Sequence, residues 1–389
     1  MKFFINSYFG DNQSIGLLSH IKKRLPYGMD DQWMVFSHYT ERGWTVDNLW
    51  HIFTDFYGGQ YVPLAFLSYL VLYAGFGYDP FYFHMFSLLL HIGCVCLVWK
   101  LISSLLRVHG GVSEKQILYV NFITTLLFAV HPINVEAVAW ISALKVLLYA
   151  FFYLLGLLCY LRYIRTSKIF YYVLTIGCFL CSFWGKEQAV TFPLALLIVD
   201  WFTNRNMKNL EVWSEKMSFL IMAFFFGIIT VLSQGKGPYE MIFPLYQRLL
   251  FGCFALVEYI TKSLLPVNLN FFYPFPIVLG EEPPLHYYLY PVVLLFLMGW
   301  IIAYRNNRYL VFGVLLFLVN LLFSIHLFNM SRHAIVADRY MYLSYVGIAF
   351  LIANGIWWLR KRLSYFKAAL VFLFFYCFFL SVYTFHYTK

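Results

Sequence analysis

The sequence contains few charged residues. Asp, Glu, Lys and Arg together make up 12% of its 389 residues, whereas 62% are hydrophobic. A soluble domain is roughly one-quarter charged and about half apolar, and it buries its apolar side chains in an aqueous core. A chain of this composition cannot do so, which excludes a soluble enzyme.

Cysteines with the spacing of a metal site or a disulfide are also lacking. All seven cysteines fall within apolar segments, and no two lie in loops that could be cross-linked. We therefore expect no disulfide framework, no structural zinc and no metal ligand set; no cofactor is certain, and a divalent metal is allowed but not indicated. Residues 1–25 lack the uninterrupted apolar core of a signal peptide.

The sequence has no single basic face, although its formal net charge is +10. Lys and Arg occur in short clusters between apolar runs. Clusters of this kind mark the ends of membrane spans, whereas a nucleic-acid-binding protein gathers its basic residues on one surface. We expect no nucleic-acid partner and take the lipid bilayer as the surroundings of the chain.

Long apolar runs are abundant. About 20 apolar residues in a helix cross the roughly 30 Å hydrocarbon core of a bilayer. The runs predict an all-α polytopic membrane protein with about ten to twelve spans and external loop helices. The stretches 61–78 and 246–265 are short or broken by polar residues, so each could cross, re-enter or lie in the interface. The ten clearer spans lie near residues 81–106, 117–133, 137–161, 169–185, 188–203, 215–233, 285–304, 308–328, 339–359 and 364–386.

The basic residues indicate how the spans are oriented. If 246–265 does not cross, the loops on one side hold most of the Lys and Arg residues after residue 79, which makes that side cytoplasmic. We therefore place 246–265 as an amphipathic or re-entrant helix within one external loop, 234–284. The basic residues assigned to the cytoplasmic side are Lys100, Arg107, Lys115, Arg162, Arg165, Lys168, Arg205, Lys208, Lys216, Arg305, Arg308, Arg360, Lys361, Arg362 and Lys367.

Acidic residues gather on the opposite side. Asp and Glu contribute little to orientation, so their asymmetry is not required by topology and indicates an external working face. The acidic residues assigned to it are Asp79, Glu136, Glu187, Glu240, Glu258, Glu281, Glu282 and Asp338.

Polar clusters at the predicted membrane boundaries are the candidate site residues, because ionisable groups near hydrocarbon are costly. The adjacent carboxylates of Asp30 and Asp31 repel each other, so one can keep a raised pKa and act as a general base. The alternative is a pair of solvated turn residues. His84 and His91 are seven residues apart on one helix face and are either buried hydrogen-bonded side chains or contacts to a phosphate or a metal.

Three more clusters lie at the external ends of spans. His131 and Glu136 flank a turn after Pro132, where Glu136 either caps a helix or points into a cavity. Lys186 and Glu187 form an adjacent pair that could simply neutralise itself. The cationic residues of the last external loop can hold a phosphate or serve as interfacial anchors. This loop contains Arg332, His333, Asp338 and Arg339.

In this order the motifs resemble the transmembrane and tetratricopeptide-repeat-containing O-mannosyltransferases and their bacterial relatives in the type C glycosyltransferase superfamily. The resemblance covers nearly the whole chain from about residue 30. Its more specific pieces are HPINVEAVAWIS at 131–142 and KEQAVTFP at 186–193. The other pieces are DDQW at 30–33, YVPL at 61–64, the His pair at 84 and 91, Asp200, 265–274 and ADRYMY at 337–342.

The resemblance implies a type C glycosyltransferase-like helical bundle whose external loops close over a cavity. It implies that Asp30 or Asp31 takes the proton from an acceptor hydroxyl, and that Glu136, Lys186, Glu187, Arg332, Asp338 and Arg339 line the same cavity. Three features depart from the family pattern. No span precedes the Asp pair, Lys145 is followed by Val146 where the family often has Asp, and no tetratricopeptide repeat follows residue 386.

The basic residues alone favour a membrane span at 61–78 and a cytoplasmic N-terminus. The resemblance instead places Asp30 and Asp31 on the external face and makes 61–78 an interfacial helix. We divide the chain into an external N-terminal region, 1–80, with the acidic pair and an interfacial helix, and a transmembrane domain, 81–389. The predicted function is inverting transfer of a sugar, with mannose as the family-level expectation, from a polyprenyl-phosphate donor to a protein, glycolipid or polysaccharide acceptor. We expect a multi-pass protein of a bacterial inner membrane whose site faces the periplasm.

Two other classes explain part of the pattern. A transporter or flippase of lipid-linked sugars would also use aromatic walls and cationic phosphate contacts, but it would have little need for the acidic pair. A membrane scaffold without chemistry would explain the spans and leave the external polar clusters unexplained.

Overall fold

The computed structural model describes residues 31–234, 243–270, 272–326 and 334–387, and these residues are predominantly helical. The N-terminal region contains four helices, α2 (Asp31–Met34), α3 (His38–Glu41), α4 (Val46–Thr54) and α5 (Pro63–Phe76). The bundle contains α6 (Pro80–His109), α7 (Glu114–Val130), α9 (Leu144–Thr166), α10 (Ile169–Gly185), α11 (Phe192–Phe202), α12 (Leu210–Gln234), α14 (Leu289–Ala303), α15 (Arg308–Leu321), α16 (Met341–Trp358) and α17 (Leu363–Tyr387).

Shorter elements connect these helices. A two-stranded antiparallel sheet pairs β1 with β2, with Tyr273 opposite Val336, and it is a small exception to the all-α prediction. The connecting elements are η1 (Pro132–Asn134), α8 (Val135–Ala139), η2 (Ile141–Ala143), η3 (Glu187–Thr191), α13 (Leu245–Leu264), β1 (Tyr273–Pro274), η4 (Leu285–Tyr288), β2 (Ala334–Val336), η5 (Asp338–Tyr340) and η6 (Leu359–Lys361).

The predicted polytopic membrane protein is confirmed in its coarse form. Within the described residues, six helices are long and apolar enough to cross a membrane, and a seventh is added if α7 and Pro132–Ala139, bent by 51°, form one span. Each of the ten predicted intervals contains a helix, but several of these helices are short: α10 has 17 residues, α15 has 14 and α11 has 11. The count of ten to twelve spans stays a prediction.

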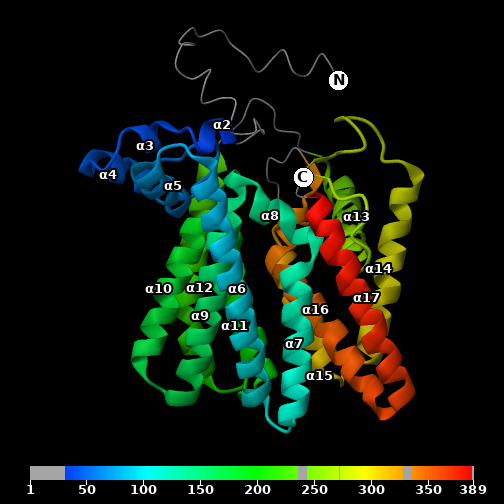
Figure 1. The fold of residues 1–389 in the computed structure, drawn as a ribbon. Helices are drawn as coiled ribbons and strands as arrows, with labels where there is room; N and C mark the ends of the chain where they lie inside the picture. The colour runs from blue at the N-terminus through cyan, green and yellow to red at the C-terminus, as the bar shows by residue number, and fades with distance from the viewer. Residues whose placement is uncertain (1–30, 235–242, 271, 327–333, 388–389) are drawn as a thin grey trace.

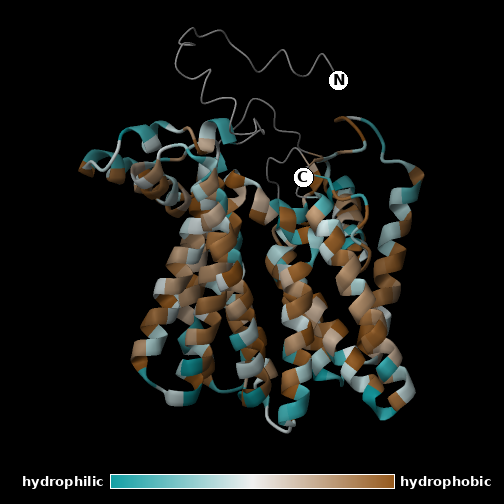
Figure 2. Cartoon of the chain, viewed as in Figure 1, coloured by the Kyte–Doolittle hydropathy of each residue, from teal (hydrophilic) through white to brown (hydrophobic). Residues whose placement is uncertain are grey.

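Figure 1 shows that the bundle has two different ends. Helices α2–α5, α8 and α13 lie at one end, and the turns that follow α6, α9, α11, α14 and α16 lie at the other. In Figure 2 the hydrophilic residues gather at both ends and the hydrophobic residues cover the region between them, as a bilayer requires. The basic clusters predicted to share one side of the membrane therefore lie at one end of the bundle.

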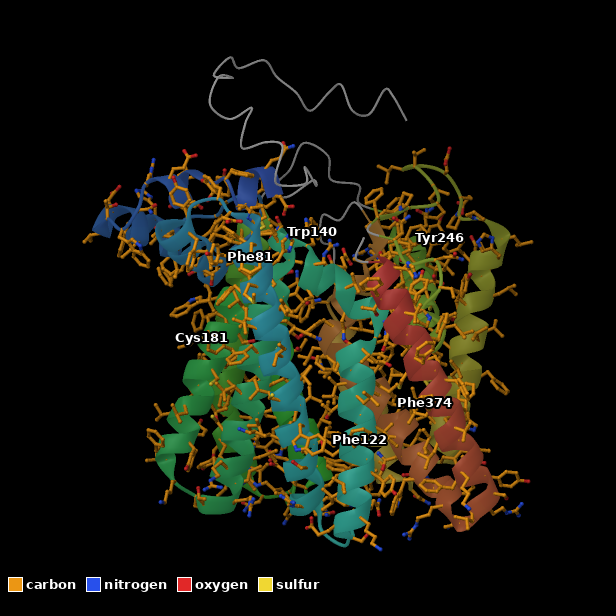
Figure 3. All side chains as sticks on the ribbon, in the orientation of Figure 1. Phe81, Phe122, Trp140, Cys181, Tyr246 and Phe374 are labelled. Carbon is orange, nitrogen blue, oxygen red and sulfur yellow. The ribbon has the colours of Figure 1, made fainter. Side chains whose placement is uncertain are left out.

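Apolar packing holds the bundle together, and apolar side chains also cover its outside. Helix α9 is central, and Tyr153 and Tyr160 in it are fully buried. At the periphery Phe122 of α7 and Phe374 of α17 are 53% and 68% exposed, and Figure 3 labels both on the outer surface. Exposed rings of this size are costly in water but suit hydrocarbon.

The N-terminal region packs directly on the bundle. Its buried side chains, including Met34, Tyr39 and Phe66, form one cluster with Ile141 and Leu144. The hydroxyl of Tyr69 in α5 donates a hydrogen bond to the carbonyl oxygen of Ile141 at 2.9 Å. Residues 31–76 are thus attached to the end of the bundle at the start of α9.

Candidate functional site

The segment between α7 and α9 organises the candidate site. We expected a tight turn here, with a span that starts near residue 137; instead η1, α8 and η2 occupy residues 132–143, and α9 begins at Leu144. Pro132 has no backbone N–H and cannot continue the helical ladder. The Nδ1 atom of His131 accepts a hydrogen bond from the backbone N–H of Ile133 at 3.2 Å. The broken segment presents Glu136 and Ser142 to partners far away in the sequence.

Glu136 in α8 pairs with Arg339 in η5. One carboxylate oxygen accepts a hydrogen bond from the backbone N–H of Arg339 at 2.6 Å, and the other forms an ion pair with the guanidinium of the same residue. The Glu136 residue is only 6% exposed. The sequence left open a helix cap or a cavity residue, and the structure gives the buried Glu136 a specific partner, Arg339.

Lys186 and Glu187 lie next to this pair, and Lys186 contacts the same Tyr340 ring as Arg339. The Arg339 guanidinium lies 5.1 Å from the Trp140 ring centroid and 5.2 Å from that of Tyr340. The Lys186 ammonium lies 5.4 Å from the Tyr340 centroid and 3.7 Å from a carboxylate oxygen of Glu187. The turns after α10 and before α16 therefore meet, and Figure 3 labels Trp140 at the same end of the molecule as α2 and α8.

Asp338 belongs to a neighbouring group that includes β1 and α13. The Tyr273 hydroxyl is 3.1 and 3.0 Å from the two carboxylate oxygens of Asp338. Burial is the largest cause that raises the pKa of Tyr273 above its usual range, and the negative charge of the nearby Asp338 raises it further. The Lys262 ammonium lies 4.6 Å from the Tyr273 ring centroid and 3.4 Å from a carboxylate oxygen of Glu258. Our sequence reasoning missed Lys262; a lysine inside the apolar stretch 246–265 was the available signal.

Asp31 is buried against η2. Its Oδ1 atom accepts a hydrogen bond from the backbone N–H of Ser142 at 2.9 Å and another from the Ser142 hydroxyl. Lys145, three residues after Ser142, donates a hydrogen bond to the side-chain oxygen of Gln60 at 2.7 Å. Ser142 and Gln60 are not marked in the sequence, because no local pattern indicates a partner more than 80 residues away. Asp30 lies outside the described residues.

The remaining candidate residues are placed as follows. His91 lies between helices of the bundle, where its Nδ1 is 2.7 Å from the Tyr342 hydroxyl and its Nε2 is 3.3 Å from the carbonyl oxygen of Ala129. His84 lies near the start of α6 and is partly buried, and His131 is buried with its ring centroid 4.2 Å from that of Tyr345. Arg332 and His333 lie outside the described residues.

These residues can form ion pairs and hydrogen bonds with a ligand. Asp31 at one end of the segment 131–143 and the Glu136–Arg339 pair near the other place carboxylates and cations around a single short stretch of chain. In the part of the chain that the structure describes, no group of three or more His, Cys, Asp or Glu side chains is arranged to hold a metal ion.

Curated proteins of similar sequence are named as protein O-mannosyl-transferases. The chain is 32% identical over 189 residues to protein O-mannosyl-transferase TMTC2 of Mus musculus, an alignment that covers 44% of this chain and 21% of that protein. It is 33% identical over 189 residues to the TMTC2 protein of Homo sapiens, covering 44% of this chain and 21% of that protein. It is 28% identical over 172 residues to Tmtc3 of Drosophila melanogaster, covering 39% of this chain and 18% of that protein.

These matches confirm the resemblance predicted from the motifs. The chain spans about one-fifth of the length of the curated relatives it matches. No protein-family profile matches the chain. No solved structure matches it.

Proposed function

From the resemblance to protein O-mannosyl-transferases, we propose that the chain is a membrane glycosyltransferase that moves a sugar, with mannose as the first candidate, from a polyprenyl-phosphate donor to an acceptor hydroxyl. The observation that carries the proposal is the polar cluster around residues 131–143, which joins Asp31 with Glu136 and Arg339 at one end of an apolar bundle. A membrane scaffold has no need for such buried charges.

The acidic pair supplies the general base. In the proposed step the acceptor oxygen attacks the anomeric carbon, its proton passes to a carboxylate of Asp30 or Asp31, and the bond from that carbon to the phosphate oxygen breaks. Attack from the side opposite the leaving group inverts the anomeric configuration. The hydrogen bonds from Ser142 hold Asp31 in one orientation, which favours a base that must meet a hydroxyl in a defined geometry.

Cations near Tyr340 stabilise the departing polyprenyl phosphate. Arg339 and Lys186 lie on the same ring, and each already faces a carboxylate, Glu136 and Glu187 respectively. A phosphate dianion would compete with those carboxylates for the two cations. We assign Arg332 and His333 of the preceding loop as further phosphate contacts. We assign His84 and His91 to the part of the cavity that binds the donor. The positive charge near the phosphate lowers the barrier most, because it acts where charge develops.

We further propose that the site faces the non-cytoplasmic side. Helices α2 and α8, which contain Asp31 and Glu136, lie at the end of the bundle opposite the turns that carry the basic clusters, and basic loops favour the cytoplasm. The corresponding assignment is an inner membrane of a bacterium with the site toward the periplasm. Residues 1–80 would then form an external cover, and 81–389 would form the transmembrane domain with an external loop at 234–284.

The test uses the purified chain in closed lipid vesicles with a polyprenyl-phosphate mannose that carries a radiolabelled sugar. The double variant Asp30→Asn with Asp31→Asn should release no polyprenyl phosphate while it expresses and folds normally. Asp79→Asn is the matched control, because Asp79 caps α6 at the same end and Asn caps a helix equally well. Full activity of the double variant would refute the base assignment. Movement of the intact donor across the bilayer without phosphate release would favour the transporter.

A further inference from the structure

Two grooves lie beside the last turns of α6, at the end of the bundle opposite the candidate site. One runs between α6 and α7 with a volume of about 340 Å³, and the other runs between α6 and α9 with a volume of about 350 Å³. Ser103 and Arg107 line both grooves, so the two hollows flank the same stretch of α6. Figure 1 shows this end of α6 between α7 and the α9–α10 turn.

The α6–α9 groove has an unbalanced positive charge. Lys100, Arg107, Arg162 and Arg165 line it, and no acidic side chain of the described residues is among its lining residues. In the α6–α7 groove Glu114 pairs with Arg107 at 3.2 Å. The C-terminal ends of α6 and α9 attract cations, which explains Arg107 and Arg165. Lys100 lies roughly 10 Å before Arg107 along α6, beyond the last turn in which the helix end acts on a charge.

A buried amide provides an independent indication of a ligand. Asn121 of α7 lines the α6–α7 groove and is 1% exposed, and its side-chain oxygen is buried without a hydrogen-bond partner in the structure. No hydrogen bond to this oxygen holds the amide in its present orientation, and an unpaired buried polar atom costs about 1–3 kcal/mol. Half a rotation of the amide exchanges its oxygen and its NH₂ group, so Asn121 can accept or donate at this position.

We infer that these grooves bind an anionic glycerophospholipid of the leaflet at this end of the protein. The cations of the α6–α9 groove hold the phosphodiester, and Trp99 and Leu118 contact an acyl chain. After the half rotation, the NH₂ group of Asn121 donates a hydrogen bond to an ester carbonyl of the glycerol backbone. Asn121 lies roughly 10 Å along α7 from Glu114, which places it deeper than the charged groups, as ester carbonyls lie deeper than phosphates. The bilayer supplies this ligand, because these grooves open beside membrane-spanning helices.

The inference does not depend on the proposed enzymatic activity. Arg107 and Arg162 lie near the C-terminal ends of α6 and α9, at the end of the bundle opposite α2 and α8. The site would anchor the ends of α6, α7 and α9 in the membrane and couple the stability of the bundle to lipid composition.

The test measures lipid retention by native mass spectrometry and the unfolding temperature of the purified protein in detergent. Phosphatidylglycerol should remain bound and raise the unfolding temperature more than phosphatidylcholine, which has the same ester groups but no net charge. The double variant Arg162→Gln with Arg165→Gln should weaken phosphatidylglycerol binding by about fivefold for each charge removed. The matched control Arg360→Gln with Lys361→Gln removes two charges at the same end, outside the grooves, and should keep wild-type binding.

The second arm tests the buried amide. Asn121→Leu leaves the positive charges of the α6–α9 groove intact and should still reduce the retention of phosphatidylglycerol. Unchanged retention would overturn the role of Asn121. Equal losses in the groove variant and its control, or equal binding of phosphatidylcholine, would overturn the site. Stabilisation by soluble glycerol phosphate to the same extent would assign a free-anion site and overturn the lipid.

Discussion

Glu136 and Arg339 are 203 residues apart in the sequence, and the Glu136 carboxylate binds both the backbone N–H and the guanidinium of Arg339. This relationship ties the broken segment after α7 to the turn before α16. It also fixes the orientation of Arg339 over Trp140, so the pair both supports the fold and positions a cation of the candidate site.

The first prediction concerns this pair. Arg339→Gln should lower the free energy of unfolding by about 3–5 kcal/mol, because it removes the cation that faces the buried Glu136 carboxylate, and Glu136→Gln should lower it by less, because the Arg339 side chain is partly exposed. The double variant should lose clearly less than the sum of the two single losses. Denaturant unfolding of the three variants measures the coupling, and additive losses would show that the two residues do not interact.

The second prediction concerns Lys186. Lys186→Gln should lower sugar transfer by about a hundredfold, since it removes a cation from the site of the leaving phosphate. Lys186→Arg should retain much of the activity because the charge and the contact with Tyr340 persist. Initial rates at saturating donor distinguish the two variants. Equal activity of Gln and Arg at this position would contradict the proposed role in stabilising the phosphate.

The third prediction concerns the attachment of the N-terminal region. Lys145→Met removes the hydrogen bond to Gln60, and a hydrogen bond to a charged group contributes about 1.5–3 kcal/mol. Amides of α2 and α3 should therefore exchange with deuterium about tenfold faster or more. Lys168→Met, at the opposite end of the bundle, should leave their exchange unchanged. A variant with wild-type exchange would show that Lys145 does not hold this region.

The fourth prediction concerns close packing of α15 and α16. A Cβ atom on Gly347 would lie 2.5 Å from the carbonyl oxygen of Gly313 and 2.7 Å from the backbone nitrogen of Phe317. Gly347→Ala should destabilise the protein by about 1–3 kcal/mol or more, because two backbones must separate. Gly355→Ala on the same helix meets no atom within 4 Å and should be neutral or slightly stabilising. Thermal unfolding compares them; similar shifts would contradict the tight crossing.

The fifth prediction concerns pH. Burial by itself would raise the pKa of Asp55, but hydrogen bonds from His51 and Tyr39 outweigh it and hold the pKa below its usual value of 3.8. A carboxyl group with a lowered folded-state pKa contributes stability above the unfolded-state pKa, and this stability is lost as the pH falls through the folded-state pKa. The amides of α4 should lose protection from hydrogen exchange below about pH 4. Asp55→Asn should lower their protection at neutral pH and remove part of its dependence on pH. A pH profile identical to that of the wild type would contradict the prediction.

Some of the candidate site could be predicted from local sequence and some could not. Glu136, Lys186 and Arg339 were selected because a charged residue beside an apolar run is costly, and this signal is present in the sequence itself. Ser142 and Lys262 were missed because a serine or a lysine near a span has many ordinary roles. Only the contacts with Asp31 and with Tyr273 distinguish them.

The sequence by itself determined that the chain is a helical membrane protein with its polar clusters at the ends of its spans. The reason is that apolar length and the distribution of charge are properties of consecutive residues. Tertiary structure alone decided which clusters meet, as Asp31 does with Ser142 and Glu136 with Arg339. Those partners depend on which helices pack together and where they break, and neighbouring residues do not encode such distances.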